Sequence, residues 1–335
     1  MLGKHQKLEM LEVQNCDSVE EIFEVLEKRS CMIEEVVAKG EEIPRFVFSK
    51  LTNLYLGMLP SLKSFYAEMH FSEWPNLKVL KVYGCNNVEI LASEVLSIRG
   101  SHGDSQQPLF FFYKDAFPSL KKLELREMPR LKHLWRGNFL PSNAFQNLKT
   151  LKVSECDSLE NSWSSSVSFQ NLSTLQVSKC DGLRYLLTPS KTKTLGQLTR
   201  VNVSDCKRME EIVTHLGNVS DCKRMEEIVT HLGDEVMENS IVFNNLDCLE
   251  LHCLSSLKSF CCGDYSLEFS CLKKVVVRQC LEMETFCHGV LSTPKLERLQ
   301  WTEGEDEVEE CWEGNLNSTI QYLYKNMKVW SSNQD

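Results

Sequence analysis

Residues 145–160 read FQNLKTLKVSECDSLE, and the spacing of their apolar side chains is found again along most of the chain. Two leucines stand at Leu148 and Leu151, Val153 follows, and Cys156 completes the pattern. The resulting template is L-x-x-L-x-(L/V)-x-x-(C/L/M), with its first leucine taken as position one. Because side chains alternate between the two faces of a strand, apolar residues at positions four and six predict a short strand with one buried face.

The template recurs at intervals that are typical of leucine-rich repeats. Copies begin at Leu8, Leu51, Leu77, Leu120, Leu148, Leu172, Leu198, Leu246 and Leu272, and a degraded copy begins at Leu296. In regular stretches the interval ranges from 24 residues, between Leu148 and Leu172, to 28, between Leu120 and Leu148. Such intervals fall within the range of leucine-rich repeats.

An aromatic residue usually stands three residues before the first leucine, where it closes the core at the start of a coil. These residues are Phe48, Trp74, Phe117, Phe145, Phe169, Phe243 and Phe269. A single coil cannot bury its own core, so coils must stack. The sequence therefore predicts an α/β fold, a leucine-rich-repeat solenoid. We expect a curved horseshoe with a parallel sheet on the concave face and irregular loops and short helices on the convex face.

The array is expected to cover residues 1–302, with irregular stretches near 24–47, 98–116 and 214–240. In the first stretch, the strand of a repeat has largely been lost. The second contains Gly100, Gly103 and Pro108 among polar residues, which is typical of an exposed insertion, either a binding loop or a disordered excursion. In the third, NVSDCKRMEEIVTHLG at 202–217 is repeated letter for letter at 218–233. The second copy has Thr214 and Gly217 at positions one and four, which predicts a strained or looped-out half-coil.

Residues 303–335 are expected to form an acidic segment and a C-terminal helical cap. The acidic run consists of Glu303, Glu305, Asp306, Glu307, Glu309 and Glu310, which we interpret as a solvated face. Apolar residues at Ile320, Leu323, Tyr324 and Met327 are spaced as on one face of a helix. Asn317 or Ser318 is the expected cap of this helix. Exposed terminal coils of a solenoid need such a cover.

The chain contains 15 cysteines, an odd number, and its first residues lack the apolar core of a signal peptide. Both features favour reduced thiols in the cytoplasm over a disulfide framework. Cysteine at position nine is expected to be a small buried residue that can bond the backbone at the turn. A further group could suggest zinc: Cys248, Cys253, Cys261, Cys262, Cys271, Cys280 and Cys287 with His252 and His288. Because it lacks paired C-x-x-C spacing, no metal site is predicted.

The composition and motifs favour a binding protein over an enzyme. A formal charge of −10 argues against a general nucleic-acid binder, and no apolar run is long enough for a membrane span. The chain has no phosphate-binding loop, no G-x-S-x-G, no H-E-x-x-H, no G-x-G-x-x-G and no kinase signature. We therefore predict neither a catalytic site nor a cofactor.

The candidate protein-binding residues stand at positions three, five and seven, which point away from the core. They are Lys81, Tyr83, Lys122, Arg126, Lys152, Arg200, His252, Lys274, Arg278 and Arg298, accompanied by Glu124, Glu250 and Gln300. Basic residues outnumber acidic ones here although the whole chain is acidic, which suggests an acidic partner surface. Alternatively, lysine and arginine are simply tolerated on exposed strands.

Several phrases resemble the repeat region of plant nucleotide-binding, leucine-rich-repeat disease resistance proteins of the coiled-coil class. These are FPSLKKLELREMPRLKHLW, FQNLKTLKVSECDSLE, CKRMEEIV and WEGNLNSTIQYLY. The resemblance implies recognition of a pathogen effector or of a guarded host protein, and regulation of the receptor's nucleotide-binding and coiled-coil portion. No nucleotide-binding module is found in this sequence, so recognition or regulation is the most that the resemblance implies.

Two other functions stay open at this point. Cysteine-bearing leucine-rich repeats also select substrates beside F-box modules in ubiquitin ligases, although no F-box-like helical segment precedes Leu8. The letter-for-letter duplication and the lost coil are also compatible with a truncated relic of a resistance gene that has no function.

Overall fold

The computed structural model describes residues 8–22, 34–35, 45–65, 71–93, 109–111, 117–135, 145–161, 168–214, 240–302 and 309–332. They form two compact units, Met1–Leu183 and Arg184–Asp335. Each unit is a stack of coils, as the repeat template predicts. The leucine-rich-repeat fold class is therefore confirmed.

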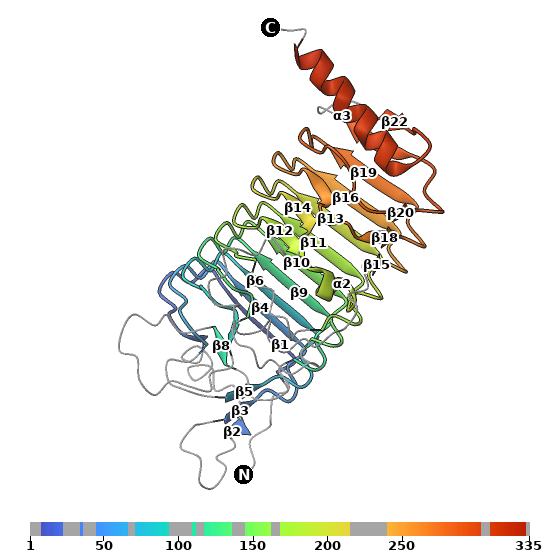
Figure 1. The fold of residues 1–335 in the computed structure, drawn as a ribbon. Helices are drawn as coiled ribbons and strands as arrows, with labels where there is room; N and C mark the ends of the chain where they lie inside the picture. The colour runs from blue at the N-terminus through green and yellow to red at the C-terminus, as the bar shows by residue number, and fades with distance from the viewer. Residues whose placement is uncertain are drawn as a thin grey trace, which may run out of the picture. The chain divides into compact units, whose positions relative to one another are not determined.

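The first unit contains a parallel ladder with one strand from each repeat (Figure 1). In pairing order its strands are β1 (Met10–Gln14), β4 (Asn53–Gly57), β6 (Val79–Tyr83), β9 (Lys122–Arg126), β10 (Thr150–Ser154) and β11 (Thr174–Ser178). The register aligns equal template positions, so that Leu54 pairs with Leu80 and Leu80 with Leu123. Equal positions of successive repeats therefore form straight rows across the ladder.

Shorter strands of the first unit lie outside this ladder. They are β2 (Glu34–Glu35), β3 (Arg45–Val47), β5 (Phe71–Glu73), β7 (Ala92–Ser93) and β8 (Phe110–Phe111). Strand β3 pairs antiparallel with β2 and parallel with β5, and β7 pairs parallel with β8. Within the expected irregular stretch near 24–47, β2 and β3 are thus ordinary strands.

The second unit has its own ladder, which consists of β13 (Arg200–Ser204), β16 (Cys248–His252), β19 (Lys274–Arg278) and β21 (Leu299–Thr302) in parallel. Strand β22 (Glu309–Cys311) ends it by pairing antiparallel with β21. Two further sheets complete the coils: β12 (Tyr185–Leu187), β14 (Glu211–Val213) and β17 (Ser259–Cys261) form one, and β15 (Ser240–Val242), β18 (Ser266–Glu268) and β20 (Leu291–Ser292) form the other. The short helix α2 (Pro189–Thr192) follows β12.

The template leucines form the core of both units. In the repeat that starts at Leu77, this residue, Leu80 and Val82 are all 0% exposed. Even the degraded last copy buries Leu296, Leu299 and Trp301. The alternation of buried and half-exposed residues along β6 and β10 is what positions four and six predict.

Asparagine or serine just before the first leucine joins successive coils, a role that the template did not indicate. The amide of Asn76 donates to the carbonyl of Ser49 at 2.6 Å, and that of Asn147 donates to Pro118 at 2.7 Å. Ser119 donates to Pro75 in the same way at 2.6 Å. These bonds satisfy carbonyl groups at turns, where no ladder is available to pair them.

Position eight has a left-handed backbone in repeat after repeat. Its φ is 51° at Met58, 61° at Gly84, 53° at Glu127 and 51° at Cys253. The amide of Met58 donates to Tyr83 at 2.9 Å and that of Leu59 to Gly84 at 3.2 Å. Bonding between coils therefore continues through the bend, and it holds residues other than glycine in a conformation that they rarely adopt.

Cysteines at position nine bond the backbone at the turn, as predicted. The thiol of Cys156 donates to the carbonyl of Ser154 at 3.3 Å, and Cys180 does the same with Ser178 at 3.2 Å. Burial raises the pKa of Cys85 and of Cys280 to about 12, against a smaller lowering by backbone hydrogen bonds. The cysteines that the structure describes are reduced thiols.

Alkylation at pH 8 is expected to distinguish these thiols from the more accessible ones. Cys85 and Cys280 should resist a short exposure to iodoacetamide. Only the thiolate reacts, and burial keeps both thiols in the protonated form. Cys262 and Cys271, which are half-exposed, should be modified. Peptide mass spectrometry measures both, and labelling in denaturant is the control. Equal labelling of all four in the native chain would contradict the buried role of position nine.

The helix expected at the C-terminus is α3 (Leu316–Ser332). Leu316 and Ile320 are buried, whereas Leu323 and Tyr324 are half-buried. The expected cap residue was wrong: the side chain of Asn315 accepts the N–H of Ser318 at 2.9 Å. Asn315 is the cap because it directly precedes the helix. From there its side-chain oxygen can reach a backbone N–H of the first turn that has no partner within the helix. In the described ranges, no helix is long and apolar enough to cross a membrane.

Other expectations fall on residues outside the described ranges. They include the second copy of the duplication at 218–233, most of the insertion at 98–116, and the acidic residues from Glu303 to Glu307. The first copy of the duplication contributes the end of β13 and then β14 to an ordinary coil. Of the acidic run, Glu310 forms an ion pair with Arg298.

Candidate protein-binding surface

The side chains that alternate with the core residues of each ladder lie on one face of its strands, which we call the open face of that unit. It consists of template positions three, five and seven of the ladder strands. The structure places the predicted binding residues here: Lys81, Tyr83, Lys122, Arg126 and Lys152 in the first unit, and Arg200, His252, Lys274 and Arg278 in the second. Arg298 is exposed and directly precedes β21.

Three lysines surround one carboxylate on the open face of the first unit. The ammonium of Lys122 lies 2.9 Å from Glu124, and that of Lys81 lies 3.8 Å from it. Partial burial raises the pKa of Glu124, but a hydrogen bond from Lys122 and the charges of Lys122, Lys81 and Lys152 outweigh this effect and lower it. Lys81 also lies over the ring of Tyr55, 5.4 Å from its centroid. The cluster therefore has an excess of positive charge.

Arg126 is balanced by acidic residues that do not belong to the strands. Its guanidinium lies 2.8 Å from Glu127 and 3.6 Å from Glu155, which both occupy position eight. Lys179, at position eight of the next repeat, also approaches Glu155 at 3.8 Å. Strand alternation alone did not indicate these residues, because they stand on the bend that follows each strand. These residues can be picked out from the sequence only when it is known that position eight lies beside the open face.

The second unit has a corresponding carboxylate at Glu250, whose side chain is only 18% exposed. Asn202 donates to it at 2.7 Å, and Lys274 lies 3.8 Å away. Burial raises the pKa of Glu250, but the hydrogen bonds from Asn202 and Cys248 and the charges of Lys274 and Arg200 lower it overall. Each unit thus places one partly buried carboxylate among several cations.

His252 lies beside Arg278 on the open face of the second unit. Burial lowers the pKa of His252, the charge of Arg278 lowers it further, and Glu250 and Asp205 oppose both effects. We therefore expect a neutral imidazole at neutral pH. Its contribution to the open face is then a hydrogen-bonding group and not a charge.

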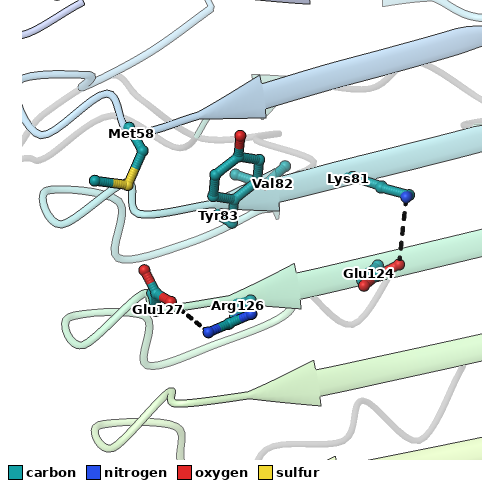
Figure 2. Close-up of a pocket in the computed structure, with 7 residues that line it drawn as sticks. All are labelled: Met58, Lys81, Val82, Tyr83, Glu124, Arg126 and Glu127. Atoms are coloured by element: carbon teal, nitrogen blue, oxygen red, sulfur yellow. Dashed lines mark ion pairs between the residues drawn. The ribbon is translucent and has the colours of Figure 1, made fainter. Parts of the chain in front are cut away.

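A hollow of 330 Å³ opens at the end of β6 in the first unit. Its lining residues are Met58, Lys81, Val82, Tyr83, Glu124, Arg126 and Glu127 (Figure 2). The sequence predicted four of these as outward residues, but Met58 and Glu127 are at position eight and Val82 is a core residue at the floor. The hollow could not be predicted from the template because it depends on glycines in neighbouring coils, Gly57 and Gly84.

The cysteine-rich stretch of the second unit has the contacts of a protein core. Cys261 and Cys287 lie opposite each other in a parallel bridge, and both are buried. Burial raises the pKa of Cys261 to about 11. Within the ranges that the structure describes, no three His, Cys, Asp or Glu residues are grouped so that they could hold a metal ion.

Stacked coils that each contribute one parallel strand and bury leucine or valine at positions one, four and six define a leucine-rich-repeat solenoid, a non-catalytic class of binding module. The chain matches the model of the leucine-rich repeats of RPS2-like plant disease resistance proteins over residues 1–99, 94–168 and 163–305. It therefore belongs to that family. No curated protein and no solved structure matches the chain.

Proposed function

We propose that this chain is a cytoplasmic protein-recognition module of plant innate immunity whose open face binds an acidic protein surface. The partner is a pathogen effector, a guarded host protein, or the nucleotide-binding and coiled-coil portion of a receptor that the chain regulates. The observation that carries the proposal is the cluster of Lys81, Lys122 and Lys152 around Glu124. A carboxylate from a partner would find more cations there than the chain itself neutralises.

The charge balance along the strands supports the same conclusion in each unit. In the first unit the strands carry Lys81, Lys122, Arg126 and Lys152 with Glu12 and Glu124. Glu127 and Glu155 on the bends balance Arg126, so the excess of cations lies at the three lysines. In the second unit, Arg200, Lys274 and Arg278 stand opposite Glu250. The whole chain has a net charge of −10, so the excess of cations is local to the open face. Complementary charge of this kind speeds encounter and penalises wrong partners.

Proximity labelling in living plant tissue, with this chain as bait, would name the partner. Recovery of a nucleotide-binding receptor portion would support regulation in trans. Recovery of an effector or an unrelated host protein would support direct or guarded sensing. Recovery of a cullin-type scaffold would contradict the proposal and favour the ubiquitin-ligase adaptor.

Reversing four charges on the open face is expected to abolish capture of that partner. The variant combines Lys122→Glu, Arg126→Glu, Arg200→Glu and Arg278→Glu. Each loss is worth about 0.5–1 kcal/mol, so the sum of about 2–4 kcal/mol corresponds to a roughly 30- to 1000-fold weaker dissociation constant. A pull-down and a binding titration with the purified partner measure the effect, and circular dichroism checks the fold.

The matched control reverses four exposed lysines that stand outside the ladder strands, namely Lys50, Lys132, Lys193 and Lys258. It changes the net charge by the same amount but leaves the open face intact. We expect it to retain capture within about threefold, because exposed charges at a distance are screened by salt. If both variants bind equally well, the open face is not the binding surface.

A further inference from the structure

The hollow beside β6 exists because two neighbouring coils have glycine where others have side chains. Gly84 occupies position eight, between Met58 and Glu127 of the adjacent repeats. A Cβ built on Gly84 would lie 2.8 Å from the sulfur of Met58. Gly57 leaves room for the ring of Tyr83, whose Cζ would lie only 2.2 Å from a Cβ at that position. The ring of Tyr83 therefore lies over Gly57 of the neighbouring strand and borders the hollow.

The walls of the hollow differ in character. Met58 is an unusual exposed apolar residue, with 46% of its surface accessible, and Tyr83 adds an aromatic ring beside it (Figure 2). The opposite wall is the ion pair of Arg126 and Glu127, whose nitrogen and oxygen lie 2.8 Å apart. Tyrosine and arginine are enriched among residues that dominate binding energy, and methionine adapts to irregular shapes. The hollow thus combines an apolar wall with a polar rim.

We propose that this hollow receives one apolar side chain, of leucine or phenylalanine size, from an acidic segment of a protein partner. The proposal deepens the function proposed above and rests on it. The apolar side chain would cover Met58 and Tyr83, which are otherwise in water. Carboxylates next to it in the segment would lie over Lys81, Lys122 and Lys152, where one carboxylate, Glu124, meets three cations. An acidic segment without an apolar residue would use only half of this surface.

The test uses short fluorescein-labelled peptides and the full chain. Three probes differ in one respect each: Asp-Glu-Leu-Asp-Glu, the same peptide with a central alanine, and Lys-Lys-Leu-Lys-Lys. Fluorescence anisotropy measures each dissociation constant at low ionic strength, where electrostatic attraction is least screened. We expect the acidic leucine peptide to bind at least about tenfold more tightly than either of the other two, because only this probe meets both walls.

Variants of the lining residues locate the binding to the hollow. Tyr83→Ala and Met58→Ala should each weaken binding of the acidic leucine peptide by about tenfold, and Tyr83→Phe should restore it because the ring is retained. Met10→Ala is the matched control. Met10 is an exposed methionine on the same open face, with 49% of its surface accessible, but it does not line the hollow.

Three results would overturn the inference, and each is distinct from failure of the proposed function. The first is equal binding of the leucine and alanine peptides by the native chain. The second is unchanged binding in Tyr83→Ala and Met58→Ala. The third is self-association that is lost in Tyr83→Ala, measured by analytical ultracentrifugation, which would identify a second copy of the chain as the occupant. If the four-charge variant nevertheless loses its partner, the proposed function stands without this hollow.

Discussion

Replacing Trp74 with alanine is expected to lower the free energy of unfolding by about 3–5 kcal/mol. Trp74 is completely buried at the aromatic position of its repeat. Its ring stacks on Phe48 with centroids 4.1 Å apart, and it meets Phe65 and Phe110 edge to face at 5.1 and 5.6 Å. Alanine would leave a cavity in the middle of this cluster, and the surrounding coils could close it only in part. Urea denaturation followed by circular dichroism measures the change.

Trp74→Phe is the matched control for this prediction. Among the described residues, the indole N–H of Trp74 has no hydrogen-bond partner, so phenylalanine would remove a buried donor that gains nothing. A benzene ring can still stack on Phe48, and we expect a loss below about 1.5 kcal/mol, as for other shape-conserving core changes. If the alanine variant is as stable as the phenylalanine variant, aromatic packing between coils is not a major source of stability.

The coil architecture could be predicted from sequence because one physical constraint determines it. A short coil has too few residues to bury its own apolar side chains, so leucines at a fixed interval must meet those of the next coil. For this reason the template predicted the burial of Leu80 and Val82, and even that of Leu299 and Trp301 in the degraded copy. It predicted the outward direction of Lys81 and its equivalents by the same alternation.

The bend at position eight could not be predicted because its cause is not local. Met58, Glu127 and Cys253 have little tendency to adopt a positive φ. Their conformation is imposed by hydrogen bonds to the adjacent coil, such as that from Met58 to Tyr83 at 2.9 Å. A template that records only apolar residues has no information on a turn where the residue type varies from repeat to repeat.

This limit also affected the prediction of the binding surface. Counting charges on strands alone predicted a basic face, and the structure adds Glu127 and Glu155 from the bends around Arg126. The hollow beside Tyr83 depends on Gly57 and Gly84, which stand in different repeats and become neighbours only when the coils stack. Which of the predicted residues contact a partner stays a prediction, and the charge-reversal and peptide experiments test it.

The C-terminal cap shows the same division between pattern and contact. The spacing of Ile320, Leu323 and Tyr324 was sufficient to predict α3. The same spacing could not predict the role of Asn317, because the side chain of Asn317 does not cap the helix but contacts the preceding coil. Its amide oxygen accepts the N–H groups of Phe286 at 2.9 Å and Cys287 at 3.0 Å, and its amide nitrogen donates to the carbonyl of Cys287 at 3.0 Å.

Asn317→Ala is accordingly the second substitution for which we expect a large loss of stability, about 2–4 kcal/mol. In the coils before it, backbone groups at this place are paired by the next coil: Phe260 and Cys261 donate to the carbonyl of Phe286 at 3.0 and 3.2 Å. For Phe286 and Cys287 the side chain of Asn317 takes over that role. Removing it would leave the two backbone donors without a partner, at about 1–3 kcal/mol for each group before relaxation. The carbonyl of Cys287 would still accept the hydroxyl of Thr285 at 3.1 Å.

Hydrogen exchange distinguishes this role from a general effect on α3. In Asn317→Ala, the amides of Phe286 and Cys287 should exchange at least about tenfold faster, because they lose their acceptor. Asn315→Ala removes the hydrogen bond to Ser318 and should instead cost about 1 kcal/mol, with faster exchange confined to the first turn of α3. Asn317→Asp keeps the acceptor but places a carboxylate oxygen against the carbonyl of Cys287. Its loss of stability should therefore lie between that of Asn315→Ala and that of Asn317→Ala. Unchanged exchange at Phe286 and Cys287 in the alanine variant would show that water or a shifted helix pairs these groups equally well. Side-chain hydrogen bonds from Asn317 would then not be needed to pair the backbone groups that the next coil pairs elsewhere in the array.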